Sequence, residues 1–190
     1  DALIVNLAPI TDKVISSMKK CRVISRYGVG YDNVAVEAAT KKKIWVANVP
    51  DYCGEDVSDQ ALALLMSCVR NVLKRDKLLR SGVWDITAGG KQWRIKDKVF
   101  AFIGYGQIAR ILHRKLFGFL LKKVLVYDPY VSEKTIKAAG AEKVDWNTAL
   151  KEADFISIHM PLNEKTRHVF NKEAFEKMKP TAILINTSRG

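Results

Sequence analysis

The segment VFAFIGYGQIAR, residues 99–110, has the residue types and spacing of a phosphate-binding turn. Gly104 and Gly106 follow a continuous apolar run and precede a helical pattern. A glycine at the first position permits a tight turn, and one at the second lets the backbone approach a pyrophosphate. The N–H groups of Gln107 and Ile108 would then lie at the positive end of the helix. The pattern favours a dinucleotide-binding loop over the alternative, a plain strand-to-helix turn.

An acidic residue stands where such a loop requires one. Asp128 ends the next apolar run, KVLVY, about 20 residues after Ala109, the small residue that closes the glycine motif. A carboxylate at this place can accept hydrogen bonds from the adenosine ribose, and it would repel a 2′-phosphate. We therefore predict NAD rather than NADP as the cofactor. The alternative is an Asp that only precedes Pro129 in a turn.

Three further groups could do chemistry. Arg189, in the final stretch INTSRG, has a planar and permanently charged guanidinium that can bind a carboxylate at two points. The sequence GVG at residues 28–30 could hold a carboxylate through its backbone N–H groups. The alternatives are a surface arginine and a simple turn. His159, in the loop HMPL, is expected to shape the backbone rather than to act as a catalytic base.

Strand-like runs alternate with helical patterns along most of the chain, which predicts parallel βαβ units and an α/β fold with a doubly wound parallel sheet. The expected strands are 2–6, 22–26, 44–48, 99–103, 123–127, 155–159 and 182–186, with a short piece near Val144. The expected helices are 11–20, 34–41, 56–82, 107–117, 132–139, 146–151 and 171–179.

Asp56 or Ser58 should cap the N-terminus of the helix at 56–82, and Asn171 should cap that of the helix at 171–179. Gly140 should end the helix at 132–139. The segment 82–95 should be a loop or arm. All the candidate residues follow strands, at the sheet edge where such folds bind ligands. Two such edges facing each other would make a cleft for a cofactor and a small substrate.

The composition excludes several classes of protein. The net charge of +12 comes from 32 Lys and Arg against 20 Asp and Glu, but the basic residues are spread, which disfavours a nucleic-acid-binding surface. Lysines 41–43 should sit at a helix end, where they suit the dipole. Three cysteines without ligand spacing predict neither a metal site nor a disulfide framework, and favour the cytoplasm. A membrane-spanning helix needs an apolar run of about 18 residues, and no run in this sequence approaches that length.

Seven segments together resemble the D-isomer-specific 2-hydroxyacid dehydrogenases. In family order they are RYGVGYDNV, VANVPDYCGEDVSDQALALLM, GVW, FIGYGQIAR, VLVYDPY, DFISIHMPLNEKTRHVFN and MKPTAILINTSRG. They cover nearly the whole chain, and they are most similar to the branch that includes the C-terminal-binding-protein corepressors, with phosphoglycerate dehydrogenase more distant. One departure is Leu120, which stands where a Gly is common in the family.

The resemblance implies a partial flavodoxin-like substrate domain at 1–52 and a Rossmann NAD-binding domain at 53–190. It also implies a homodimer built largely through the cofactor domain and its leading helix. Val29 and Gly30 would hold the substrate carboxylate by backbone N–H, and Arg189 would bind the 2-oxo acid and polarise its carbonyl. The residues expected at the cofactor are Gly104, Gly106, Gln107, Ile108, Asp128, His159, Met160, Pro161, Thr187 and Ser188. The family's catalytic Glu and His would lie downstream, so the chain is expected to be a fragment lacking both ends.

These features favour an NAD-dependent oxidoreductase that transfers a hydride between nicotinamide and a small D-2-hydroxy acid or 2-oxo acid. The alternative is a non-catalytic, NAD(H)-sensing scaffold of the corepressor type that binds protein partners. The third hypothesis, a basic nucleic-acid-binding protein, is disfavoured by the spread of charge. The sequence does not predict the side chain of the substrate.

Overall fold

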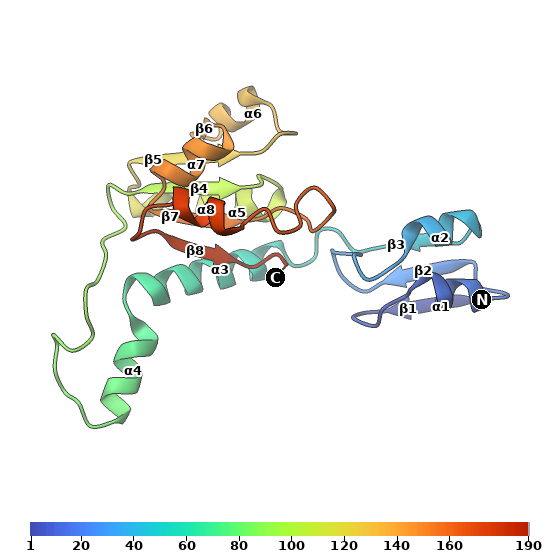
Figure 1. Cartoon of the computed structure of the whole chain (residues 1–190), viewed down its shortest axis with the longest axis horizontal. Coiled ribbons are helices and arrows are strands. Elements are labelled where there is room, and N and C mark those ends of the chain that lie inside the picture. The colour runs from blue at the N-terminus through green and yellow to red at the C-terminus, as the bar shows by residue number, and fades with distance from the viewer. Residues whose placement is uncertain (190) are drawn as a thin grey trace. The chain divides into compact units, whose positions relative to one another are not determined.

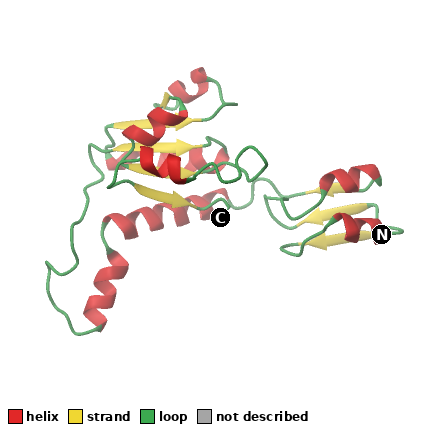
Figure 2. Cartoon of the chain, in the orientation of Figure 1, coloured by secondary structure: helices red, strands yellow, loops and turns green. Residues whose placement is uncertain are grey.

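A computed structural model describes residues 1–189, which form two compact units (Figure 1). The first unit spans Asp1–Cys53, and the second begins at Gly54. Each unit has a parallel sheet with helices packed on it (Figure 2). Within the described residues, none of the helices combines the length and the apolar character needed to cross a membrane.

The first unit has a three-stranded parallel sheet in the order β1-β2-β3. Its elements are β1 (Ala2–Val5), α1 (Asp12–Ser17), β2 (Val23–Arg26), α2 (Val36–Lys41) and β3 (Trp45–Ala47). Alternate strand residues face opposite sides of a sheet. Ile24 is therefore buried against Ile15 of α1 and Ala39 of α2, whereas Ile4 and Trp45 are 78% and 80% exposed.

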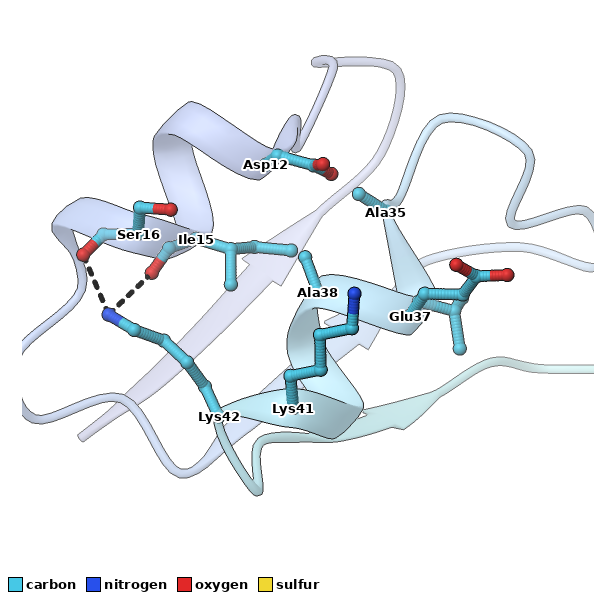
Figure 3. A pocket seen from close by; sticks show the side chains of 9 residues that line it. Asp12, Ile15, Ser16, Ala35, Glu37, Ala38, Lys41 and Lys42 are labelled. Atoms are coloured by element: carbon cyan, nitrogen blue, oxygen red, sulfur yellow. Dashed lines mark hydrogen bonds between the residues drawn. The ribbon is translucent and has the colours of Figure 1, made fainter.

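Lys42 joins the two helices of this unit (Figure 3). Its Nζ donates to the carbonyl oxygens of Ile15, Ser16 and Met18 at 3.1, 2.6 and 3.0 Å. These carbonyls lie at the C-terminal end of α1, where a helix has unpaired acceptors and a partial negative charge. The lysine run was expected to serve the end of its own helix. Lys41 does lie in the last turn of α2, but Lys42 caps the neighbouring helix α1.

The second unit has a five-stranded parallel sheet in the order β6-β5-β4-β7-β8. The strands are β4 (Val99–Ile103), β5 (Lys123–Tyr127), β6 (Glu142–Lys143), β7 (Phe155–Ile158) and β8 (Ile183–Asn186). The chain starts at the central strand, moves to one edge, and returns to build the other half. This is the doubly wound order, so the predicted fold class is confirmed. All of β4 is buried, as its continuous apolar run predicts.

Helices cover both faces of this sheet. The elements are α3 (Gly54–Val69), α5 (Gln107–Leu116), the 3₁₀ turn η1 (Phe117–Phe119), α6 (Glu133–Ala138), α7 (Trp146–Glu152) and α8 (Lys172–Lys177). One core joins α3, α5 and α6 to Phe100 and Phe102 of β4. The other joins α7 and α8 to Ala101 and Ile103, which point to the opposite face of the same strand.

The single long helix predicted at 56–82 is wrong. It is two helices, α3 and α4 (Val72–Arg80), and the chain turns at Asn71, whose φ is +54°. Asn adopts this left-handed conformation more readily than most residues. Its side-chain amide donates to the carbonyls of Gly89 and Lys91, at 3.1 and 2.7 Å. These bonds hold the arm at residues 82–95 against the turn between α3 and α4.

The other predicted helix ends are confirmed in two of three cases. The start of α3 is Gly54, so neither Asp56 nor Ser58 is its cap. Asn171 caps α8, where its Oδ1 accepts from the N–H of Ala174 at 3.0 Å. Gly140 follows α6 with φ of +79°, as expected for a glycine that closes a helix. Leu120 also has a left-handed φ, +53°, a conformation that glycine adopts more readily than leucine.

Candidate functional site

The two glycines of the loop after β4 have different surroundings. Gly104 has φ of +89°, and a Cβ there would lie 2.8 Å from the carbonyl carbon and oxygen of His159. Gly106 is the N-cap residue of α5 with an ordinary φ of −75°, and a Cβ there would meet no atom within 4 Å. Gly104 therefore permits the turn and its close packing, whereas Gly106 keeps the space beside the helix N-terminus open. Gln107 and Ile108 are the first residues of α5, so their N–H groups lie at its positive end.

Asp128 lies at the end of β5, next to this loop, and is buried. Its Oδ2 accepts from the N–H of Tyr105 at 2.8 Å, and its Oδ1 accepts from the N–H groups of Tyr130 and Val131 at 2.8 and 3.0 Å. A carboxylate offers about four acceptor sites. Asp128 thus fixes the glycine loop to β5 and retains acceptor capacity for a ribose hydroxyl. The sequence pattern does not predict this bracing role, and ribose binding stays a prediction.

His159 follows β7 and faces into the protein. Its Nε2 lies 2.8 Å from the hydroxyl of Ser157, and burial lowers the pKa of the imidazole to about 4. The ring is therefore neutral near pH 7, and a base with this pKa is poorly matched to proton transfer at neutral pH. These properties suit the expected role of His159 in shaping the backbone of its loop.

A pocket of about 240 Å³ lies at the ends of β7 and β8. It brings together predicted residues from two loops, since Met160 and Pro161 line it with Arg189. Ser188 donates to the carbonyl of Ile158 at 3.0 Å, which fixes the loop after β8 to the end of β7. Further lining residues are Ile158, Leu162, Thr166, Arg167, Phe170 and Asn186.

Arg189 is exposed at this pocket, at the end of a loop that folds on itself. The Asn186 side chain accepts from the N–H of Ser188 at 2.9 Å and donates to the carbonyl of Arg189 at 2.7 Å. The Arg189 Nη1 donates to the Ser188 carbonyl at 3.0 Å. These bonds hold the arginine backbone in a defined place at the carboxyl edge of the sheet.

Two observations show that this edge fits a dinucleotide. The side of Gly106 is open at the N-terminus of α5, where a pyrophosphate can approach the backbone. The Thr187 hydroxyl is buried and, among residues 1–189, has no hydrogen-bond partner. A buried polar atom without a partner is rare and calls for an explanation such as a ligand.

The loop after β2, residues 27–33, carries the predicted carboxylate site of the first unit. Gly28 has φ of +143°, which is open to glycine but not to other residues without strain. Its carbonyl accepts from the N–H of Val49 at 3.1 Å, and the carbonyl of Val29 accepts from the Asn48 side chain at 2.8 Å. The loop after β3 thus holds both carbonyls in place. The binding role of Val29 and Gly30 stays a prediction.

Arg26, the last residue of β2, is a charged residue that the sequence analysis missed. It is only 8% exposed, and its guanidinium packs under Gly28, where a Cβ would overlap Nη1. Nη1 donates to the carbonyl of Tyr27 at 2.7 Å, whereas Nε is buried and finds no acceptor in the described part of the chain. A buried cation with an unsatisfied donor is costly. An arginine two residues before the GVG turn was the available signal.

Two aromatic residues stand beside this charge. The rings of Tyr27 and Tyr52 stack with centroids 6.4 Å apart. Cys53 raises the pKa of the Tyr52 hydroxyl, and the Arg26 charge partly offsets the effect.

The second unit is, by its strand order, glycine loop and acidic residue, a dinucleotide-binding domain of the Rossmann class. A family model described as "D-isomer specific 2-hydroxyacid dehydrogenase, NAD binding domain" matches residues 62–190. The chain belongs to the D-isomer-specific 2-hydroxyacid dehydrogenase family, which confirms the resemblance and the NAD class of cofactor.

Relatives with assigned names support the same family. The chain is 37% identical to a glyoxylate reductase of Thermococcus litoralis and 36% identical to a hydroxypyruvate reductase of Thermotoga maritima, each match covering the whole chain. It spans 59% and 61% of their lengths. A D-lactate dehydrogenase from Aquifex aeolicus has been solved as a complex with NAD and lactic acid. Its structure matches this chain with a TM-score of 0.93 at 27% identity, and the match covers all of this chain and 56% of that one.

The different surroundings of the two glycines predict different consequences of adding a methyl group. Gly104→Ala should destabilise the protein by about 1–3 kcal/mol or more, because it strains the backbone and presses on the His159 carbonyl. Gly106→Ala should leave the melting temperature nearly unchanged but weaken NADH binding about tenfold or more, by blocking the approach to α5. Thermal unfolding and fluorescence titration measure the two effects. Equal effects of both substitutions on stability would contradict a structural role for Gly104 and a ligand-access role for Gly106.

Proposed function

We propose that this chain is part of an NAD-dependent oxidoreductase that interconverts a small D-2-hydroxy acid and its 2-oxo acid. We further propose that residues 1–52 belong to its substrate domain and residues 53–190 to its cofactor domain. The supporting observation is the pocket at the ends of β7 and β8, where Arg189 lies with Met160 and Pro161. Names of relatives such as glyoxylate reductase support the same reaction class.

Bound cofactor would supply the hydride that is exchanged with C2 of the substrate. Backbone N–H groups at Gln107 and Ile108 would hold its pyrophosphate, and Asp128 its adenosine ribose. His159, Met160, Pro161, Thr187 and Ser188 would complete the contacts along the sheet edge. The buried Thr187 hydroxyl would gain a hydrogen-bond partner, which the described part of the chain does not supply.

The chain's own residues would carry the substrate chemistry. Val29 and Gly30 would bind the carboxylate through N–H groups, above the buried charge of Arg26. Arg189 would stabilise the negative charge that grows on the carbonyl oxygen as the hydride arrives. A proton must also reach this oxygen, and the low pKa of His159, about 4, makes His159 unsuitable as its donor.

The function is tested by NADH oxidation with the full-length protein, against glyoxylate, hydroxypyruvate, pyruvate and bulkier 2-oxo acids. Arg189→Ala should lower kcat/KM by about 10²–10³, as loss of one stabilising donor does, with NADH affinity nearly unchanged. Tight NADH binding without turnover of any 2-oxo acid would instead favour the non-catalytic scaffold. A collapse of NADH affinity in the variant would show that Arg189 is structural.

The buried charge of Arg26 can be tested separately. Arg26→Met keeps an unbranched apolar stem and removes the guanidinium with its charge, so the KM for a 2-oxo acid should rise about tenfold, within the range for a lost charged contact. NADH affinity should not change. Arg22→Met is a matched control, because Arg22 is exposed near the other end of the same strand. An unchanged KM, or an equal change in both variants, would refute the role of Arg26.

We also propose a cytoplasmic homodimer assembled through α4 and the arm at 82–95. Apolar side chains are exposed along both, including Leu73 at 70%, Trp84 at 88% and Ile86 at 83%. A pocket of about 660 Å³ lies between them, lined by Leu79 and Val83 among others. Exposed apolar surface of this kind marks an interface, and a second copy is the occupant that the family resemblance implies.

The proposed cytoplasmic location is supported by the three cysteines, which are free thiols as a reducing compartment favours.

The dimer predicts that an acidic group on the arm separates the subunits. Trp84→Glu should convert dimers to monomers, because it places a charge in an apolar interface. Light scattering of the full-length protein after gel filtration measures this. Tyr130→Glu is a control, because Tyr130 is also highly exposed, at 85%, but lies outside the arm. A monomeric parent protein, or a dimer that survives Trp84→Glu, would contradict the assignment.

A further inference from the structure

Tyr105 stands between the two glycines of the cofactor loop, yet its side chain is only 1% exposed. It points into the core shared by α5 and the sheet, not toward the open side of Gly106. A dinucleotide loop needs only the backbone at this position, so a large polar side chain buried here requires an explanation. Its contacts supply one.

The hydroxyl of Tyr105 lies 2.6 Å from Nδ1 of His113, which is two turns along α5. Burial raises the pKa of the Tyr105 hydroxyl and lowers the pKa of His113. The tyrosine therefore keeps its proton and the imidazole stays neutral near pH 7. The hydroxyl can then donate and Nδ1 accept, in a surrounding of low polarity where the bond is strong.

Other contacts hold Tyr105 from different elements. Its N–H donates to Asp128, directly after β5, at 2.8 Å, and its carbonyl accepts from Nε of Arg110 at 3.2 Å. The Arg110 guanidinium lies over the ring, 5.6 Å from the centroid, and Phe102 of β4 meets the ring edge-on at 5.8 Å. One residue thus connects β4, β5 and α5 at the point where the loop turns.

We propose that Tyr105 and His113 are positioning residues for the cofactor, whose partly buried hydroxyl–imidazole bond holds the glycine loop in its binding conformation. This inference rests on the proposed NAD-dependent function. Gly104 and Gly106 flank Tyr105, and glycines have the widest backbone freedom of any residue. Without the anchor, the loop would sample other conformations, and ordering it would weaken cofactor binding.

Two single substitutions and their combination separate positioning from stability. Tyr105→Phe leaves Nδ1 without its donor, and His113→Leu leaves the hydroxyl without its acceptor, so each should lower the melting temperature. The double variant removes both polar groups and should recover much of that stability. The dissociation constant for NADH should nevertheless stay raised about fivefold in all three, roughly the equivalent of one hydrogen bond.

The measurements are NADH fluorescence titration, thermal unfolding, and hydrogen exchange of the amides at 105–108, all on the full-length protein without substrate. Faster exchange of these amides in the double variant, with raised dissociation constant and recovered stability, is the expected result. Ile136→Val is the matched control, because Ile136 is fully buried in the same core on α6 and should change stability alone.

Three outcomes would contradict the positioning role of Tyr105 and His113. If NADH affinity follows the melting temperature and returns in the double variant, the pair is only structural. Unchanged affinity in all variants overturns the positioning role while leaving the proposed function intact. A parent protein that does not bind NADH overturns both.

Discussion

The close contact between Gly104 and the backbone of His159 sets the geometry of the cofactor edge. It brings the turn after β4 against the turn after β7, at a distance that leaves no space for a side chain. Both turns leave adjacent parallel strands, so their spacing is fixed by the ladder between Ile103 and Ile158. The N-terminus of α5 and the loop holding Met160 are thereby placed on one edge, where an open α/β sheet binds its ligands.

The rest of the edge is held by buried polar groups whose partners come from other elements. Asp128 connects β5 to the glycine loop, and Ser188 connects the loop after β8 to the end of β7. Such bonds are costly to break in a region of low polarity, so they specify one arrangement of the loops. Thr187 and Arg26 differ, since within residues 1–189 each keeps a buried polar atom without a hydrogen-bond partner at a predicted binding loop. The missing hydrogen bonds of these two side chains support a role of both loops in ligand binding.

Much of the fold could be predicted because the deciding interactions are local. The continuous apolar run at β4, the glycine after α6 and the cap at Asn171 depend on residues within a few positions of one another. The break between α3 and α4 could not be predicted in the same way. The helical pattern continues through it, and the turn is stabilised by bonds from Asn71 to Gly89 and Lys91, which are distant in sequence.

The sequence by itself determined the alternation of strands and helices, the glycine motif with its acid, and the family. These properties depend on residue types at short spacing, and such spacing constrains backbone conformation directly. Only the tertiary structure decided that Lys42 caps α1, that Asp128 braces the loop, that Arg26 is buried, and that Tyr105 pairs with His113 beneath the glycine loop. Burial and long-range pairing arise when separate elements pack together, so no local pattern specifies them.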